Sequence, residues 1–376
     1  MIAIEKPKND VEYRLLEIWT SLFGKEEIGT NQDYFELGGD SLLAVRVFKR
    51  IEAEFQIRIP MATLFEAPTI ELLADFIQRT GSRDARSSNA WSSLVAIQPN
   101  GSRPPFFCVH GAGGNVVFYL NLARHLGSDQ PFYGLQSPGL DGKRAFLTRI
   151  EEMAACYVKE VRTRQPKGPY FLGGYCMGGT IALEMAQQLR NQGQEVALLA
   201  LMDTLNWANA TPNSWRDALQ ISFQKVVFHW KNFLLIDNKD KMRFIREKLT
   251  VLRNRVQIWS SSASFKNPFR KAPQSLDLAR LWHTNDRAML SYVPKAYAGR
   301  VVHFRPLEQY AKDDVPEREW DQLAAGGVEK ITLPVYPAGM LVEPFVSLLA
   351  AKLRDCIDIS MNARMAAGQA GRGVLK

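Results

Sequence analysis

Residues 169–189, PYFLGGYCMGGTIALEMAQQL, decide the fold of the larger part of this chain. An apolar run ends in Gly174-Tyr175-Cys176-Met177-Gly178, and helical periodicity follows at once, so the pattern predicts a strand, a sharp turn and a helix. Such a turn needs small residues, because its central backbone is strained and the helix packs close to the strand. Cysteine at its centre has the place of a nucleophile, and the helix N-terminus favours a thiolate. The alternative is a buried structural cysteine.

The sequence around this turn predicts a mostly parallel sheet covered by helices on both faces. From about Leu94, apolar runs alternate with helical periodicity, which is typical of that architecture. The runs are LVAIQ, PFFCVH, PFYGLQ, PYFLGGY, EVALLALMD, GRVVHF and KITLPVY. A helical insertion containing Trp and Phe interrupts them over about 206–274, and long insertions of this kind commonly form lids. The Gly- and Ala-rich end, 361–376, is expected to be disordered.

Two further segments place polar groups at strand ends. EVALLALMDT ends a strand in Asp203, where a carboxylate can orient a histidine, although a plain cap of the next turn is the alternative. In PFFCVHGAGG a turn follows the strand directly. That turn can bring the N–H of Ala112 beside that of Met177 to form an oxyanion hole. His110 is expected to shape the turn rather than to ionise.

The first 80 residues predict a small helical bundle. Amphipathic helices are expected over 10–23, 41–55 and 68–79, and the polar run that follows, 81–93, predicts a flexible linker. Ser41 comes directly after Gly38-Gly39-Asp40 and falls in the first turn of the second helix. Free backbone N–H groups and the helix dipole favour a phosphate there. A simple capping pair after a Gly-Gly turn fits the same spacing.

LGGDSLLAVRV closely resembles the attachment motif of peptidyl and acyl carrier proteins, and the match covers about 8–80. The resemblance implies a four-helix carrier domain in which Ser41 carries a covalent 4′-phosphopantetheine. The cofactor's thiol then holds the growing acyl chain. A phosphopantetheinyl transferase is the implied partner that attaches the cofactor.

In chain order, the HGAGG turn, the strand–turn–helix around Cys176 and the strand end at Asp203 resemble the terminal thioesterase domains of nonribosomal peptide and polyketide synthetases. The resemblance covers about 94–358 and implies an α/β-hydrolase fold with a helical lid at 206–274. It further implies that Cys176 accepts the acyl chain and that Asp203 is the acid of a catalytic triad. Condensation and adenylation domains of upstream modules are the implied partners.

The sequence departs from that family at two places. Cys176 stands where the family normally has serine, and no histidine precedes the Met340–Pro344 stretch, where Pro337 and its neighbours are found instead. Either the domain has lost its base, or another histidine serves in its place. His283 is favoured, because it precedes the helix TNDRAMLSY, which we expect to begin on the active-site face. His303, inside a strand, is second. The remaining histidines are His110, His125 and, in the insertion, His229.

The composition argues against membrane, secreted, zinc-binding and nucleic-acid-binding proteins. No run is apolar and long enough to cross a membrane and no secretory signal is present, so we expect a cytoplasmic protein without a membrane partner. Four cysteines without CxxC pairing predict no zinc site and no disulfide scaffold. The net charge of +8 divides into −5 over residues 1–80 and +13 over the rest. We interpret this asymmetry as domain docking rather than as binding of nucleic acid.

Cysteine as the nucleophile bears on the product. It keeps the acyl group as a thioester with a good leaving group, which suits closure of a strained ring better than hydrolysis. Cysteine-dependent releasing domains are known in similar synthetases that make β-lactones or monobactam β-lactams, as in sulfazecin-type assembly. The predicted function is therefore release of a peptidyl thioester by intramolecular cyclisation. Hydrolytic release, macrocyclisation and a non-catalytic docking module are the alternatives.

Overall fold

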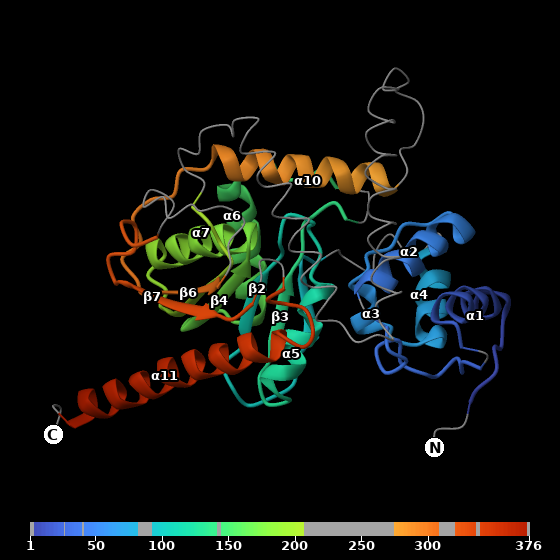
Figure 1. The fold of residues 1–376 in the computed structure, drawn as a ribbon, viewed down its shortest axis with the longest axis horizontal. Coiled ribbons are helices and arrows are strands. Elements are labelled where there is room, and N and C mark those ends of the chain that lie inside the picture. The colour runs from blue at the N-terminus through green and yellow to red at the C-terminus, as the bar shows by residue number, and fades with distance from the viewer. Residues whose placement is uncertain are drawn as a thin grey trace.

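A helical N-terminal part and a sheet-containing part make up the chain (Figure 1). The computed structural model describes residues 4–25, 27–39, 41–81, 92–140, 144–206, 274–307, 320–335 and 339–373. The expected lid thus lies outside the described residues, except for its first and last positions. So do most of the expected linker, Asp40, His229 and Pro337.

The N-terminal part is helical, as predicted. Its helices are α1 (Asp10–Phe23), α2 (Ser41–Phe55), α3 (Thr63–Glu66) and α4 (Ile70–Gly81). Asn9 caps α1 by accepting a hydrogen bond from the Glu12 N–H at 3.0 Å, and Gly24 ends the helix in the left-handed region at φ 65°. The short α3 was not predicted. Burial of Leu15, Trp19, Tyr34 and other apolar side chains forms a core of its own.

The sheet has seven strands in the order β1-β3-β2-β4-β5-β6-β7. Only the edge strand β1 runs antiparallel to its neighbour, and the other pairs are parallel. The strands are β1 (Leu94–Gln98), β2 (Phe106–Val109), β3 (Phe132–Leu135), β4 (Tyr170–Tyr175), β5 (Val196–Met202), β6 (Val301–Pro306) and β7 (Val328–Leu333). Each was expected from its apolar run. Because β2, β4, β5 and β6 are parallel, their carboxyl ends meet at one edge.

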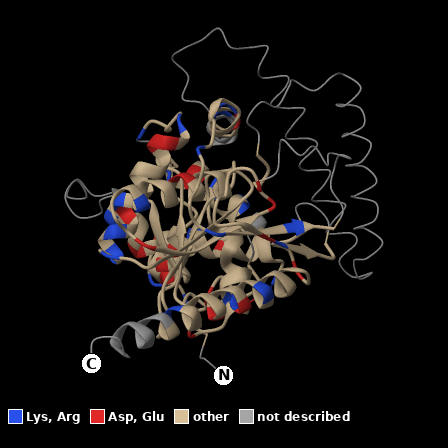
Figure 2. Ribbon diagram, turned by 90° about the vertical axis from the view of Figure 1, so that its left-hand side faces the viewer, with Lys and Arg blue, Asp and Glu red and all other residues tan. Residues whose placement is uncertain are grey.

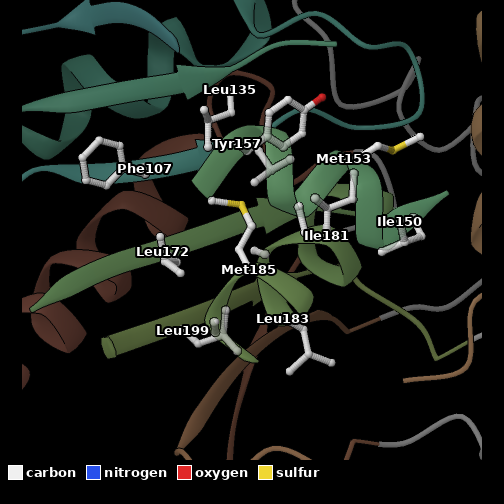
Figure 3. Close-up of a cluster of buried hydrophobic side chains, with 14 of the residues drawn as sticks. Phe107, Leu135, Ile150, Met153, Tyr157, Leu172, Ile181, Leu183, Met185 and Leu199 are labelled. Carbon is white, nitrogen blue, oxygen red and sulfur yellow. The ribbon is translucent and has the colours of Figure 1, made fainter. Parts of the chain in front are cut away.

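Helices cover both faces of this sheet. They are the 3-10 turn η2 (Val117–Tyr119), α5 (Leu120–Leu126), α6 (Ile150–Arg164), α7 (Met177–Asn191), α10 (Gln274–Ser291) and α11 (Val346–Gly373). Figure 3 shows one core, in which Phe107, Leu172 and Leu199 of neighbouring strands meet side chains of α6 and α7. A second core joins the other face to α5 and α11. The thioesterase-like part is therefore a three-layer α/β structure.

The C-terminal end corrects one expectation. Residues 361–373, expected to be disordered, continue helix α11, which runs away from the sheet in Figure 1. Ala and Met are strong helix formers, and the Arg364 guanidinium lies 2.8 Å from a carboxylate oxygen of Glu195, which ties the helix to the strand layer. Figure 2 shows basic and acidic residues interspersed along this helix. Within the described ranges, no helix is both long and apolar enough to span a bilayer.

The helical part packs against the sheet domain near α5. Val117 of η2 is buried in the core of the helical part, and Ala62, between α2 and α3, is buried in the core of the sheet domain. The Arg124 guanidinium lies over the Phe35 ring, 5.8 Å from its centre. Both ends of the expected linker, 81–93, belong to structured elements. Gly81 is the last residue of α4, and the Ser93 N–H donates to Glu160 on α6 at 3.2 Å.

Candidate active site

Cys176 occupies a strained turn between β4 and α7. Its φ of 53° and ψ of −122° lie outside the regions that L-residues normally adopt, at a cost of about 1–3 kcal/mol. Two backbone hydrogen bonds hold the turn: the Cys176 N–H donates to Met202 O at 2.8 Å, and Cys176 O accepts from the Gly179 N–H at 3.0 Å. The thiol is thereby presented at the carboxyl edge of the sheet.

The glycines on either side of Cys176 are required by close packing. A Cβ at Gly174 would lie 2.1 Å from the carbonyl carbon of Gly178, and a Cβ at Gly178 would lie 2.3 Å from Val109 O. Both contacts are with backbone, which cannot move aside as a flexible side chain can. The sequence prediction of a strand–turn–helix with obligatory small residues is confirmed.

The pKa of Cys176 corrects the expectation of a favoured thiolate. Burial and the negative charges of Asp203 and Asp286 raise this pKa to about 11, and the Met177 N–H, which hydrogen-bonds the sulfur, opposes them. Removal from water and two nearby carboxylates outweigh the helix N-terminus. At neutral pH Cys176 is therefore a thiol, and a base must take its proton before it can attack.

Asp203 follows β5 directly, as predicted. Its φ is 46°, and its N–H donates to Phe304 O at 2.9 Å, which fixes the strand end against β6. The Tyr175 hydroxyl donates a hydrogen bond to Asp203 Oδ2 at 3.4 Å. Asp203 thus lies beside the nucleophile turn, within electrostatic reach of Cys176.

The loop that follows β2 lies against the start of α7. The predicted oxyanion donor Ala112 is buried, and its carbonyl accepts a hydrogen bond from Asn285 Nδ2 at 2.8 Å. The other predicted donor, Met177, is the first residue of α7 and directs its N–H at the Cys176 sulfur. A Cβ at Gly113 would lie 3.3 Å from the Trp282 ring. Helix α10 therefore covers this loop.

His110 has the structural role expected of it. Its Nδ1–H donates to Gly111 O at 2.6 Å, and its Nε2 accepts from the Tyr157 hydroxyl at 2.6 Å. Burial lowers the pKa of His110 to about 4, so the ring is neutral. Tyr119 links β2 to β4 in the same region: its hydroxyl donates to Val109 O at 2.6 Å and accepts from the Tyr175 N–H at 3.0 Å.

The two candidate bases differ in their surroundings. We expected His283 to precede a helix, but it is the tenth residue of α10, and its side chain is exposed. Even so, α10 lies over the Ala112 loop, on the face where the helix start was expected.

His303 is buried in the middle of β6, opposite Leu201 of β5. Leu201 in turn pairs with Gly174, two residues before Cys176, so the ring is about 6–7 Å below the strand end that carries the thiol. Among the described residues neither ring nitrogen makes a hydrogen bond of good geometry, although the backbone of Thr204 lies close enough to raise the pKa of His303. Burial, with smaller effects of Arg305 and Lys330, outweighs this and lowers that pKa to about 3. This environment is that of a core histidine.

Three residues near the site were missed at the sequence level. Asn285 and Asp286 lie on α10, and Tyr175 precedes the nucleophile. One signal was available for Asn285: Leu281, Ala288 and Tyr292 define a buried stripe of helical period, and Asn285 falls within it with no exposed surface. Nothing in the local pattern marks Asp286.

A small pocket of about 30 Å³, partly open to solvent, lies where the helical part meets the sheet domain. It is lined by Val45, Arg58, Ile59, Pro60, Met61, Asn115, Gly139, Leu140, Phe146 and Leu281. Val45 is one helical turn after Ser41, at which α2 begins. Leu281 packs on the Gly114 end of the loop that contains Ala112. The pocket thus joins the start of α2 to the surroundings of the Cys176 site.

Comparison with protein families assigns both parts. A family described as the thioesterase domain matches residues 104–296. A second, the phosphopantetheine attachment site, matches residues 14–77. In this second family the cofactor is bound covalently to a serine.

Curated relatives are multidomain synthetases. The chain is 44% identical over 200 residues to malpinin synthetase of Mortierella alpina, a match that covers 53% of this chain and 2% of that protein. It is 38% identical over 197 residues to a dimodular nonribosomal peptide synthase of Bacillus subtilis, covering 52% of this chain and 8% of that protein. The chain thus spans only a small part of the length of either relative.

Among solved structures, the NocB thioesterase domain in covalent complex with a fluorophosphonate nocardicin G analog is 26% identical. Its TM-score is 0.51, and the match covers 71% of this chain and 100% of that domain. A holo four-domain nonribosomal peptide synthetase bound to AMP and glycine shares the fold over 94% of this chain and 26% of that one, with a TM-score of 0.55 and 24% identity.

Proposed function

Since this chain belongs to the thioesterase domain family of nonribosomal peptide synthetases and carries a phosphopantetheine attachment site, we propose that it releases a carrier-bound peptidyl thioester through an acyl-enzyme on Cys176. The observation that carries the proposal is the strained turn that presents the Cys176 thiol beside the Met177 N–H. The covalent complex of the NocB thioesterase domain supports a covalent intermediate on this fold.

The carrier side of the reaction starts at Ser41. The helix α2 begins at this residue, and the N–H groups of a helix N-terminus favour a phosphate. The pocket that Val45 lines one turn later is mostly apolar, and its Arg58 is paired with Glu52 at 2.9 Å. When bound to Ser41, 4′-phosphopantetheine supplies the thiol that carries the acyl group.

Acyl transfer to Cys176 needs a base and an oxyanion site. The sulfur forms a bond to the acyl carbon while the carrier C–S bond breaks, and the thiol proton moves through the base to the departing thiolate. Backbone N–H groups of Met177 and Ala112 stabilise the oxyanion of the intermediate. The acid at the end of β5, Asp203, stabilises the positive charge that the base acquires.

The base is assigned to His283. Its helix contacts the Ala112 loop through Asn285, and the His283 side chain is exposed. His303 is the alternative, but it is buried below the strand ends. The pKa of about 11 at Cys176 makes this base necessary already for acylation, and not only for release.

Release by intramolecular cyclisation follows from the thioester. The thioester on Cys176 keeps a good leaving group. A weak internal nucleophile can therefore close a strained four-membered ring, either a β-lactam or a β-lactone. Upstream condensation and adenylation domains of the synthetase would supply the peptide, and a phosphopantetheinyl transferase would load Ser41. Hydrolysis and macrocyclisation are the other two outcomes of the same acyl-enzyme.

Intact-mass analysis tests the proposal directly. The full chain is loaded at Ser41 from a synthetic peptidyl-coenzyme A by a phosphopantetheinyl transferase, and the mass of the thioesterase-containing fragment is followed after quenching. We expect an acyl adduct that maps to Cys176 and is absent from Cys176→Ala, together with a released cyclic product. A protein that never forms this adduct would instead be a docking module.

A further inference from the structure

We propose that Asn285 positions the oxyanion site, because its side-chain amide holds the peptide that follows Ala112. The inference rests on the proposed function, in which the Ala112 N–H stabilises the oxyanion during acyl transfer to Cys176. Asn285 acts through the loop after β2 and is therefore a positioning residue. Helix α10 becomes the support of that loop.

The loop after β2 forms a four-residue turn with the predicted donor at its centre. The Gly114 N–H donates to Gly111 O at 2.9 Å, so Ala112 and Gly113 are the two central residues. Gly111 O also accepts from the Nδ1–H of His110 at 2.6 Å. Because the Ala112 N–H lies in the same planar peptide as Gly111 O, these two hydrogen bonds fix its direction.

The next peptide, between Ala112 and Gly113, is held from outside the turn. Asn285 Nδ2 donates to Ala112 O at 2.8 Å, and Asn285 has no exposed surface. The central peptide of such a turn can rotate as a unit when the third residue accepts a positive φ, as glycine does. Gly113 lies outside the left-handed region in this structure. The hydrogen bond from Asn285 therefore selects one of two orientations of this peptide.

The orientation of this peptide bears on the oxyanion. Its dipole lies next to the Ala112 N–H, and rotation of the peptide would reverse that dipole. Donors and dipoles that are oriented before the reaction stabilise an oxyanion without a cost of reorganisation. Loss of the Asn285 hydrogen bond would thus weaken transition-state stabilisation although both N–H donors remain in the chain.

Helix α10 is held on both sides of Asn285. Before it, Leu281 is buried against Gly114, where an added Cβ would lie 2.5 Å from Leu281 Cδ2. After it, the Tyr292 hydroxyl donates to Glu184 Oε2 on α7 at 2.6 Å. Asn285 lies between these contacts on the same buried stripe, so its amide is fixed relative to the turn.

Stability alone does not explain an asparagine at this position. Among the described residues, Asn285 Oδ1 is buried without a hydrogen-bond partner, and an unpaired buried acceptor costs free energy. Leucine has nearly the same shape and would avoid that cost. The donor half of the amide, which binds Ala112 O, is the half that the turn uses.

The test compares two reactions of Cys176 in the full chain. Acylation by the N-acetylcysteamine thioester of acetyl-Ala-Ala passes through an oxyanion: the sulfur–acyl bond forms, the thioester C–S bond breaks, and N-acetylcysteamine leaves with the thiol proton. Alkylation by iodoacetamide, which releases iodide and a proton, forms no oxyanion.

We expect Asn285→Leu to slow single-turnover acylation by about 10–100-fold, below the loss that follows deletion of an oxyanion donor. The alkylation rate should stay at that of the parent. A merely structural role would change both rates, because a displaced turn also displaces the thiol.

Asn285→Asp supplies a second variant, of matched shape, should leucine unfold the chain. A carboxylate cannot donate to Ala112 O, whereas the protonated acid can. The acylation rate relative to the parent should therefore rise as the pH falls from 8 to 5. His110, Cys176, His283 and Asp286, the other titratable groups of α10 and of the elements around it, are present in both chains. Asn285→Leu separates loss of the donor from the effect of an added charge.

Gln187→Leu is the matched control. Gln187 Nε2 also donates to a backbone carbonyl, Lys295 O, at 2.9 Å, but it lies about 15 Å along α7 from Met177. This variant should keep both rates. Parent-like acylation by Asn285→Leu, an equal loss in both reactions, or an Asn285→Asp ratio that does not rise at low pH overturns the inference while Cys176 acylation stands. Absence of any adduct in the parent chain overturns the proposed function, and this inference with it.

Discussion

The Tyr175 hydroxyl donates a hydrogen bond to Oδ2 of Asp203 at 3.4 Å, so the residue that precedes the nucleophile binds the acid at the end of the next strand. The two residues are brought together by register, because Tyr175 pairs with Met202 in the parallel β4–β5 ladder. Asp203 is therefore held beside Cys176 whether or not a histidine reaches it. Its charge acts on the thiol at short range.

Removing that charge should make Cys176 a more reactive thiol. Asp203 raises the pKa of Cys176 toward about 11, so Asp203→Asn lowers this pKa and the thiolate forms at lower pH. We expect faster alkylation by iodoacetamide at pH 9, with the midpoint of the rate against pH moved downward, measured by peptide mapping. Glu195→Gln, which affects only the ion pair with Arg364, is the control. An unchanged midpoint would show that Asp203 is not electrostatically coupled to the thiol.

Ser41 should be the single site of phosphopantetheine attachment. Incubation of the full chain with a phosphopantetheinyl transferase and coenzyme A is expected to add one cofactor, seen by intact mass. Ser41→Ala should accept none, whereas Ser92→Ala, a serine hydrogen-bonded to Glu160 outside the carrier, should be modified as the parent is. Modification of Ser41→Ala would refute the assignment.

Two glycines near the site should tolerate alanine very differently. The Cβ of Gly174→Ala would meet backbone of Gly178 at 2.1 Å, so we expect destabilisation of about 1–3 kcal/mol or more. At Gly111 the nearest atom to an added Cβ is 3.7 Å away. The Gly111→Ala variant should therefore unfold at a urea concentration close to that of the parent. Urea denaturation of both variants measures the difference. Equal stabilities would contradict the close-packed turn.

His303 should matter for stability at acid pH and not for release. Its folded pKa of about 3 lies below the unfolded value of about 6.5, so the unfolded state binds more protons between these limits. Stability is therefore lost as the pH falls through this window. His303→Phe should reduce that loss, measured by urea unfolding at pH 7 and pH 5, and should retain product release. His303→Leu checks that the result does not depend on ring size. Loss of Cys176 acylation or of product release in both variants would make His303 the base.

Serine in place of cysteine tests the leaving-group argument. Cys176→Ser keeps the turn but yields an oxoester, which resists attack by a weak nucleophile. We expect it to accept the acyl chain yet to release it slowly or by hydrolysis, as seen by mass spectrometry of the products. An equal yield of ring from the serine variant would falsify the cyclisation argument.

Some of these features could be predicted from the sequence because they depend on local pattern. The turn around Cys176 is encoded by glycines at fixed spacing, and the position of Ser41 is encoded by the residues just before a helix. The order of strands and helices follows from apolar runs that recur along the chain, and family comparison agrees with the two parts so defined. These patterns do not depend on contacts between residues that are far apart in the sequence.

Other features were decided only by the tertiary structure. The helix N-terminus predicted a thiolate at Cys176, but burial together with Asp203 and Asp286, from separate elements, raises its pKa to about 11. Helix α10 begins at Gln274, 97 residues after Met177, and its contact with the Ala112 loop could not be inferred from either segment alone. Local periodicity determines which elements form. Electrostatic energy depends on distances between groups that are remote in sequence, so only the packed chain determines the chemistry of the thiol.

The same reason explains why Asp286 was missed. Its neighbours in sequence give it the appearance of an ordinary exposed acid on an amphipathic helix, and its link to Cys176 exists only because α10 packs over the loop after β2. The sequence alone predicted Cys176 as the nucleophile and Ser41 as the attachment serine. The fold decided which charges surround the nucleophile, since Coulomb interactions depend on separation in space and not along the chain.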